Sequence, residues 1–303
     1  MSGLLVQWKG DRSEGVRQAP DAARQAFQES GQLLARTIEK PDYRIDCFNR
    51  IDNATDSVVS FPDGGFAACA GTLFHQRATG QEALRRIYAE FDGNPGILVG
   101  TSGHFLLAIG KGGRLFLMRD RNGAFETYAT KDRRILSTSF LALAAALPRH
   151  TLAFQEAYEY VFNGVTLGDG TVIEEIEKLG IDEWLTFGAS VQRHRHDWPL
   201  LPEPSSRMRD QLLAALHEKL LRLVDQAAGA YNGKVRLALS GGYDSRLLVA
   251  LLREAGCAPE LYVYGDAASP DVRIAMHIAE SEQVALAHLD KSDAPEPTTE
   301  QFP

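Results

Sequence analysis

The chain has 303 residues, a formal net charge of −8 and 44% hydrophobic residues, which is enough apolar material for two packed domains. The acidic balance argues against a general nucleic-acid binder, because no basic stripe stands out against it. Cys47, Cys69 and Cys257 are too widely spaced for a disulfide framework or a zinc site, so we expect each to be a small buried side chain.

The N-terminus and the hydropathy of the chain predict a cytoplasmic protein. Residues 1–10, MSGLLVQWKG, reach a charged residue too early for a signal-peptide core. No run approaches the roughly 20 apolar residues that a membrane span needs. We therefore expect neither membrane nor nucleic acid among its partners.

The first half of the chain predicts a layered α+β domain, because it alternates many short strands with few helices. The Lys111-Gly112-Gly113 sequence is a hairpin signal between two of these strands. Residues 1–60 show the weakest secondary-structure pattern of the chain. The expected elements are strands at 4–8, 66–73, 96–99, 105–109 and 114–118, and amphipathic helices at 21–39 and 80–91.

A stretch rich in Pro, Ser and His at 193–206, RHRHDWPLLPEPSS, predicts a linker between two domains, which we place at 1–200 and 201–303. His194 and His196 have no carboxylate or cysteine partner in this linker, so we expect them in solvent rather than on a metal. A long amphipathic helix is expected at 206–228, with leucines along one side and charges along the other.

The strongest functional signal lies in residues 234–252, KVRLALSGGYDSRLLVALL. An apolar run breaks at SGGYDS and then resumes, which predicts a strand, a tight glycine turn and a helix. The glycines let backbone N–H groups converge beside the positive end of the helix, so the turn can hold a phosphate. Ser240 and Ser245 can donate hydrogen bonds to phosphate oxygens, and Asp244 makes most sense as a Mg²⁺ ligand beside a nucleotide.

The plain alternative is an ordinary turn in which Asp244 or Ser240 merely caps the helix. The lysine of GxxxxGK[ST] is absent, and no GxGxxG follows a strand. Capping explains one serine or aspartate, but not two serines, two glycines and an aspartate in the single stretch 240–245. We therefore predict an ATP site formed by this turn.

The SGGYDS turn resembles the SGGxDS pyrophosphate loop of ATP pyrophosphatases, and in particular of asparagine synthetase-like proteins. A strand at 260–264, Gly265 and a Ser-Pro-Asp at 269–271 before a helix at 272–280 follow in the same order as in that family. The resemblance implies ATP and Mg²⁺ as cofactors. It also implies an ATP-binding set in which backbone groups at Leu239 and Tyr264 hold the adenine, although the side chain of Tyr264 is as well explained by a core or rim aromatic. The implied ATP-binding residues are Leu239, Ser240, Gly241, Gly242, Asp244, Ser245 and Tyr264.

The resemblance covers residues 65–292, since segments 103–130, 137–147 and 156–179 are similar to parts of the family's N-terminal glutaminase domain. The implied fold is an Ntn-hydrolase-like α+β domain followed by an incomplete α/β parallel-sheet ATP pyrophosphatase domain. In the asparagine synthetases the glutaminase uses a Cys nucleophile at position 2 with its own α-amino group.

The glutaminase residues themselves are largely absent from this chain. Ser2 stands at the nucleophile position and is a weak candidate. Ala70-Gly71-Thr72 replaces the family's Asn-Gly-Glu, and an alanine cannot replace an oxyanion-hole amide. We therefore expect an inactive glutaminase, as in the β-lactam synthetase and lasso-peptide cyclase branches, which adenylate a carboxylate and let an amine of the same substrate attack.

The ATP domain is short, because only a third strand at 285–289 precedes a polar tail at 293–303, whereas such sheets normally have four or five parallel strands. Three hypotheses follow. The first is an ATP-dependent amide-forming ligase acting on a carboxylate, either a fragment or completed by a partner chain or a second copy. The others are a non-catalytic nucleotide-binding or interaction protein and a small hydrolase using Ser2. We favour the ligase, because a two- or three-stranded sheet leaves an apolar edge unpaired.

Overall fold

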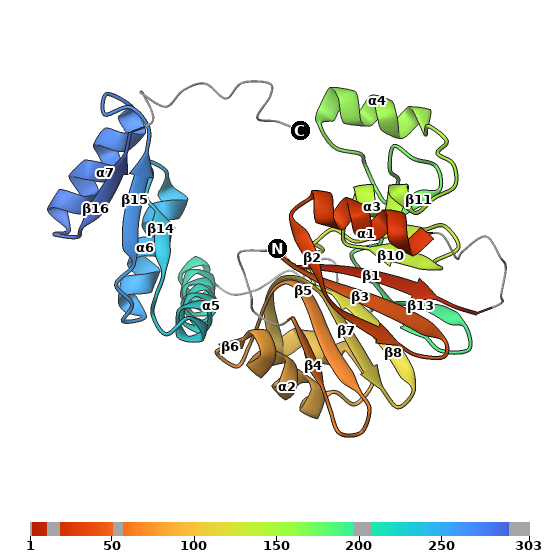
Figure 1. Cartoon of the computed structure of the whole chain (residues 1–303). Helices are drawn as coiled ribbons and strands as arrows, with labels where there is room; N and C mark the ends of the chain where they lie inside the picture. The colour runs from red at the N-terminus through yellow and green to blue at the C-terminus, as the bar shows by residue number, and fades with distance from the viewer. Residues whose placement is uncertain (1, 11–18, 51–56, 197–207, 291–303) are drawn as a thin grey trace. The chain divides into compact units, whose positions relative to one another are not determined.

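A computed structural model describes residues 2–10, 19–50, 57–196 and 208–290 (Figure 1). The chain divides into two compact units, Met1–Glu203 and Pro204–Pro303, called here the N-terminal and C-terminal units. The expected tail at 293–303 and most of the expected linker, 197–206, lie outside the described residues.

The N-terminal unit contains two antiparallel sheets. The strands of the first sheet are β1 (Gly3–Trp8), β2 (Gln32–Glu39), β3 (Tyr43–Arg50), β9 (Tyr128–Thr130), β10 (Ile135–Ser137) and β11 (Ile176–Lys178), in the order β11-β9-β10-β1-β3-β2. The strands of the second sheet are β4 (Val58–Ser60), β5 (Phe66–His75), β6 (Ala78–Thr79), β7 (Thr101–Lys111), β8 (Arg114–Arg119), β12 (Glu183–Phe187) and β13 (Val191–Arg195). Their order is β13-β12-β8-β7-β5-β4, with β6 beside β5.

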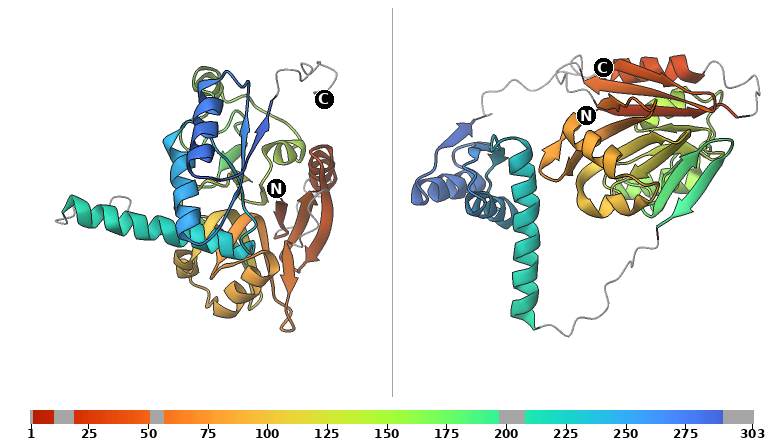
Figure 2. Two further views of the ribbon diagram at one scale, coloured as in Figure 1. Left: turned by 90° about the vertical axis from the view of Figure 1, so that its left-hand side faces the viewer. Right: turned by 90° about the horizontal axis from the view of Figure 1, so that it is seen from below.

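Helices cover the outer faces of both sheets (Figures 1 and 2). On the first sheet lie α1 (Ala19–Glu29) and α3 (Phe140–Ala145), which share a core cluster with β1, β3 and β10. On the second lies α2 (Gly80–Glu90), packed on β5, β7 and β8. A third cluster fills the space between the sheets. The unit is therefore a helix–sheet–sheet–helix sandwich, which confirms the predicted layered α+β architecture.

The sandwich explains why its central strands are apolar on both faces. In β1, Leu4 and Val6 point into the core between the sheets, whereas Leu5 points toward α1 and α3. Successive side chains of a strand alternate between faces, so a strand buried on both sides reads as a continuous apolar run. The same alternation divides β7, because Leu106 and Ala108 belong to the inner core and Leu107 packs under α2.

Most predicted elements of this unit are confirmed, but two are wrong. The helix expected at 21–39 ends at Glu29, and Gln32–Glu39 is strand β2. Gly31, with a φ of 74°, ends the helix, and the residues after it pair with β3. The strand expected at 96–99 is a 3₁₀ helix, Pro95–Gly100, because Pro95 and the Asn94 side chain, which accepts a hydrogen bond from the Gly96 N–H, start a helical turn.

The expected linker begins too early in the prediction, because 193–195 belong to β13. His194 is half-buried, with its ring stacked on Trp184 at 4.1 Å between centroids, and its Nε2 lies 3.0 Å from Thr186 Oγ1. His196 is also half-buried, and this burial lowers the pKa of its ring. The expectation that both side chains lie in solvent is wrong, since they pack on the sheet.

The helix of the 156–179 segment, α4 (Phe154–Asn163), buries none of its own side chains. Gly164 ends it in the left-handed conformation. No helix among the described residues is long and apolar enough to cross a bilayer.

The C-terminal unit is a three-stranded parallel sheet with helices. Its elements are α5 (Arg209–Ala230), β14 (Arg236–Ala238), α6 (Tyr243–Glu254), β15 (Glu260–Tyr264), α7 (Pro270–Ser281) and β16 (Leu286–Leu289). The strand order is β14-β15-β16, and both pairings are parallel. The strands and helices predicted around residues 235–289 are confirmed.

One face of this sheet carries the core of the unit. Leu239, Leu261 and Val263 from the strand side pack against Val249 of α6 and Val272 of α7. The opposite face presents Ala238, Tyr262 and Tyr264, and among the described residues of this unit no helix packs on it. Several leucines of α5 are also exposed by 45–52%: Leu212, Leu213, Leu216 and Leu223.

Candidate functional site

The SGGYDS turn lies at the carboxyl ends of the parallel strands, between β14 and α6. Three successive backbone N–H groups in this turn have acceptors. The N–H of Ser240 donates to Ser245 Oγ at 3.1 Å, that of Gly241 to Asp271 Oδ1 at 3.1 Å, and that of Gly242 to Ser240 Oγ at 3.2 Å. The two serine hydroxyl oxygens lie 3.1 Å apart. The turn thus gathers amide and hydroxyl donors, the groups that bind phosphate oxygens.

The N-cap residue of the helix that follows the turn has no side chain of its own. It is Gly242, whose N–H donates to Ser240 Oγ at 3.2 Å. Asp244 lies in the first turn and is exposed, and within the described part of the chain its carboxylate has no hydrogen bond or ion pair. Asp244 therefore does not cap the helix, whereas Ser240 bonds to the N–H of the N-cap residue, as the plain alternative expects for one of the two serines. The positive end of α6 stays available to an anion, and Asp244 to a cation.

Gly241 is required by a close approach rather than by an unusual backbone conformation. A Cβ atom at this position would lie 2.5 Å from Asp271 Oδ1 and 3.1 Å from Ile274 Cδ1. The first turn of α7 therefore lies directly against the loop. A side chain at position 241 would displace the Asp271 carboxylate, whereas the Asp271 Cα, 3.4 Å from that Cβ position, would stay in ordinary contact.

Arg246 holds the turn from the other side. Its Nε donates to the Gly242 carbonyl at 3.2 Å and its Nη2 to the Gly241 carbonyl at 3.3 Å. The guanidinium also lies over the ring of Tyr243, 4.3 Å from its centroid. Because a trans peptide points its N–H away from its carbonyl, the N–H groups of Gly242 and Tyr243 face away from Arg246.

The two residues expected near the adenine lie on neighbouring strand ends. Leu239 is buried, and its N–H donates to the Tyr262 carbonyl at 2.8 Å. Tyr264 ends β15, with 48% of its surface exposed and its ring 5.1 Å from that of Tyr262. Both residues lie at the carboxyl edge that also holds the SGGYDS turn, where ligands bind in open α/β sheets.

Ser2 lies at the start of β1, next to the Ala70-Gly71-Thr72 segment of β5. Its hydroxyl donates to the Cys69 carbonyl at 3.3 Å and accepts from the Gly71 N–H at 3.3 Å. The structure thus places the candidate nucleophile beside the segment expected to replace the family's Asn-Gly-Glu. Ala70 is fully buried and offers no side-chain donor.

The cysteine next to this segment has a raised pKa. Burial raises the pKa of the Cys69 thiol to about 12, so the thiol stays protonated near neutral pH. Burial and the nearby Asp46 carboxylate raise the pKa of the Cys47 thiol to about 12. All three cysteines are buried and free, as expected from the sequence.

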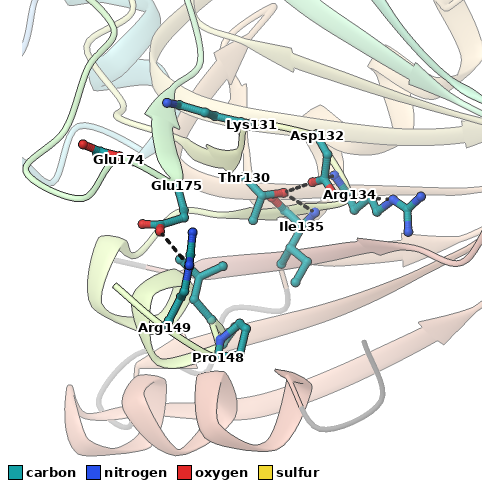
Figure 3. A pocket seen from close by; sticks show the side chains of 11 residues that line it. Thr130, Lys131, Asp132, Arg134, Ile135, Pro148, Arg149, Glu174 and Glu175 are labelled. Atoms are coloured by element: carbon teal, nitrogen blue, oxygen red, sulfur yellow. Dashed lines mark hydrogen bonds and ion pairs between the residues drawn. The ribbon is translucent and has the colours of Figure 1, made fainter. Parts of the chain in front are cut away.

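A hollow of about 530 Å³ opens elsewhere on the N-terminal unit, between the β9–β10 connection and the end of α3 (Figure 3). Four of its charged groups form two ion pairs: Arg149 Nε lies 3.6 Å from Glu175 Oε1, and Arg134 Nε lies 3.4 Å from Asp132 Oδ2. It shares no residue with the Ser2 segment or the SGGYDS turn.

No protein-family model matches the chain, and no curated protein matches it. Among solved structures it is similar to glutamine phosphoribosylpyrophosphate amidotransferase from B. subtilis complexed with ADP and GMP. The identity is 12% and the TM-score 0.43, with 95% of this chain and 90% of that chain covered. It is also similar to a structure described as the allosteric regulatory enzyme of purine biosynthesis, at 11% identity and a TM-score of 0.41, covering 99% of this chain and 69% of that one. Neither of these two is an asparagine synthetase.

Two residues of the turn's surroundings escaped the sequence prediction. Asp271 contacts the loop although it lies 30 positions from Gly241, and Arg246 follows the motif directly. In the sequence Asp271 is part of the Ser-Pro-Asp segment, and this segment does not predict a contact with the SGGYDS turn. Arg246 has a local signal, because an arginine four residues after a glycine turn can reach back to its carbonyls.

Proposed function

We propose that the chain is an ATP-dependent, AMP-forming ligase of the asparagine synthetase type that makes an amide without using glutamine. The observation that supports this most is the SGGYDS turn at the carboxyl edge of a parallel sheet. Its amides and hydroxyls converge, the N-cap residue of α6 is Gly242, and the Asp244 carboxylate is free among the described residues.

In the proposed reaction a substrate carboxylate attacks the α-phosphorus of ATP and pyrophosphate leaves, which gives an acyl adenylate. An amine then attacks the acyl carbon and AMP leaves. Ser240, Ser245 and the loop amides would hold the pyrophosphate group, with the N-terminus of α6 adding positive charge. Backbone groups at Leu239 and Tyr264 would hold the adenine.

Asp244 is the residue that would hold Mg²⁺, together with phosphate oxygens. An exposed carboxylate that makes no bond to another described residue, in the first turn of the helix after the loop amides, fits a cation shared with a nucleotide. Among the described residues no group of three or more His, Cys, Asp or Glu side chains gathers to hold a metal. Mg²⁺ supplies charge neutralisation for the phosphates when bound.

The N-terminal unit supports the proposal that glutamine is not the amine source. At the position where the glutaminase family places an asparagine amide, this chain has the buried methyl group of Ala70. Loss of one oxyanion-hole donor costs a factor of about 10²–10³ in kcat in enzymes where it has been removed. The amine would then come from the substrate itself, whose tethering raises its effective concentration.

One observation favours a second candidate. The Ser2 hydroxyl lies beside the Gly71 N–H at 3.3 Å, and removal of Met1 would give Ser2 its own α-amino group as the base that an N-terminal nucleophile needs. This candidate predicts hydrolysis of an amide without ATP, and loss of that hydrolysis in Ser2→Ala. A Ser2→Ala variant with unchanged activity removes it.

The ATP assignment is tested by calorimetry of Mg·ATP binding to the full chain and to Asp244→Ala. We expect the wild-type chain to bind and Asp244→Ala to bind at least about tenfold more weakly, since the metal loses its protein ligand. Asp210→Ala is the matched control, because Asp210 is likewise an exposed aspartate in the first turn of a helix, α5. Equal affinity in wild type and Asp244→Ala contradicts the assignment. ATP binding without pyrophosphate release would support a non-catalytic nucleotide-binding protein instead.

A further inference from the structure

The Gly241 N–H differs from its two neighbours in the turn, because its acceptor comes from another helix and carries a charge. The neighbouring N–H groups bond to the hydroxyls of Ser245 and Ser240, which belong to the turn itself. The Gly241 N–H instead donates to the carboxylate of Asp271, in the first turn of α7, at 3.1 Å. An anionic oxygen already occupies one of the amides that a phosphate would need.

The two kinds of acceptor respond differently to a phosphate. A serine hydroxyl can rotate and become a donor to the phosphate, so it changes from competitor to ligand. A carboxylate has only acceptor oxygens and repels a phosphate brought to the same amide. Asp271 therefore has to leave Gly241 before a phosphate oxygen takes its place.

The packing around Asp271 lets the carboxylate leave without moving the helix. Val272 and Ala275 are fully buried and fix α7 on the sheet, whereas the Asp271 side chain is exposed. The Asp271 Cα lies 3.4 Å from the position of a Cβ on Gly241, so the helix backbone is close to the loop. A rotation of the Asp271 side chain toward solvent is then sufficient to free the amide.

We propose that Asp271 is a built-in competitor for the phosphate-binding amide of Gly241 and sets the affinity of the turn for nucleotide. This rests on the proposed function, since it takes the SGGYDS turn to be the nucleotide site. It assigns to Asp271 the opposite role from Asp244: one carboxylate recruits the nucleotide through Mg²⁺, and the other opposes its phosphates.

Asp271→Asn separates charge from shape, because asparagine keeps the size of the side chain and an oxygen acceptor. The matched control is Asp266→Asn, since Asp266 lies in the same β15–α7 connection and accepts from the Ala268 N–H at 2.7 Å rather than from the loop. Calorimetry on the full chain would measure the affinity of each variant for inorganic pyrophosphate without metal and for Mg·ATP.

We expect Asp271→Asn to bind pyrophosphate about tenfold more tightly than wild type, and Asp266→Asn to bind like wild type. Wild-type binding of Mg·ATP with unchanged or weaker binding by Asp271→Asn overturns the inference alone, and weaker binding would make Asp271 a ligand instead. Absence of binding by both wild type and Asp271→Asn overturns the nucleotide assignment and the inference together.

Discussion

The N-terminal unit has two sheets with helices on both outer faces, but its candidate site at Ser2 lacks the side chains that a glutaminase needs. The C-terminal unit has only three strands among its described residues, but its SGGYDS turn has every residue of the SGGxDS motif. Ser2 has a neighbouring backbone amide at Gly71 but the buried methyl of Ala70 where a donor would be needed. The SGGYDS turn has amides, hydroxyls and Asp244, yet one face of its sheet is uncovered among the described residues of the unit.

This contrast between the two units shows that a well-packed core does not require a functional site, and that a functional motif does not require a sheet covered on both faces. The alternating apolar residues of β1 and β7 specify the sandwich whether or not a reaction occurs at its end. The turn depends on a few local contacts, among them Arg246 on two carbonyls, and these form without a full sheet. Substitutions in the first unit should therefore change stability, and substitutions in the turn should change binding.

The largest expected effect is on the core of the N-terminal unit. Phe27 and Phe48 are fully buried and stack at 4.0 Å between ring centroids, so Phe48→Ala should lower the free energy of unfolding of this unit by about 3–5 kcal/mol. Phe162→Ala is the control, because Phe162 is 80% exposed. Urea unfolding followed by tryptophan fluorescence reports on this unit, since all three tryptophans lie within Met1–Glu203. Equal midpoints for the two variants would contradict the core assignment.

A smaller loss of stability is expected at Gly71. Its φ is 90°, and a Cβ there would lie 2.3 Å from the His104 carbonyl oxygen, so Gly71→Ala should cost about 1–3 kcal/mol. Gly112→Ala shares the positive φ, 60°, but meets no atom within 4 Å, and should cost about 1 kcal/mol. The same unfolding experiment compares them. A Gly71→Ala variant no less stable than Gly112→Ala would show that the strand accommodates the methyl group.

In contrast to these substitutions in the N-terminal unit, a substitution in the SGGYDS turn should change Mg·ATP binding and leave stability nearly unchanged. Ser245→Ala removes a hydroxyl that contacts Ser240, and we expect Mg·ATP to bind about fivefold more weakly with little change in stability, because one phosphate hydrogen bond is lost. Ser281→Ala, at the exposed end of α7, is the control. Calorimetry and thermal unfolding of the same samples give both quantities. A stability loss with unchanged binding would assign Ser245 a structural role only.

The smallest effect is expected at the thiol beside the Ser2 segment. Because burial raises the pKa of Cys69 to about 12, its thiolate fraction is very small at pH 8, and iodoacetamide should leave it unmodified in the native chain. Unfolding in urea returns the thiol to an ordinary pKa and should permit labelling. Mass spectrometry of tryptic peptides measures both states. Rapid native labelling of Cys69 would mean that this end of the sandwich opens readily.

The sequence predicted the elements whose structure is decided by neighbouring residues. The strand, turn and helix around SGGYDS followed from an apolar run that breaks at two glycines and then resumes. Prediction from the sequence failed where the structure of a segment depends on residues far away in the chain. QLLARTIE is compatible with a helical pattern, and only pairing with β3 makes Gln32–Glu39 a strand. The Asp271–Gly241 contact joins residues 30 positions apart, and the Ser2–Gly71 contact residues 69 apart, so no local pattern predicts them.

The central claim is that the SGGYDS turn binds nucleotide while the Ser2 segment does not bind glutamine. The most direct measurement is calorimetry of the full chain titrated with Mg·ATP and, separately, with L-glutamine. We predict saturable Mg·ATP binding that is at least about tenfold weaker in Asp244→Ala, and no heat of binding with glutamine. Saturable glutamine binding in a chain that ignores Mg·ATP would contradict the account and place the active site in the N-terminal unit.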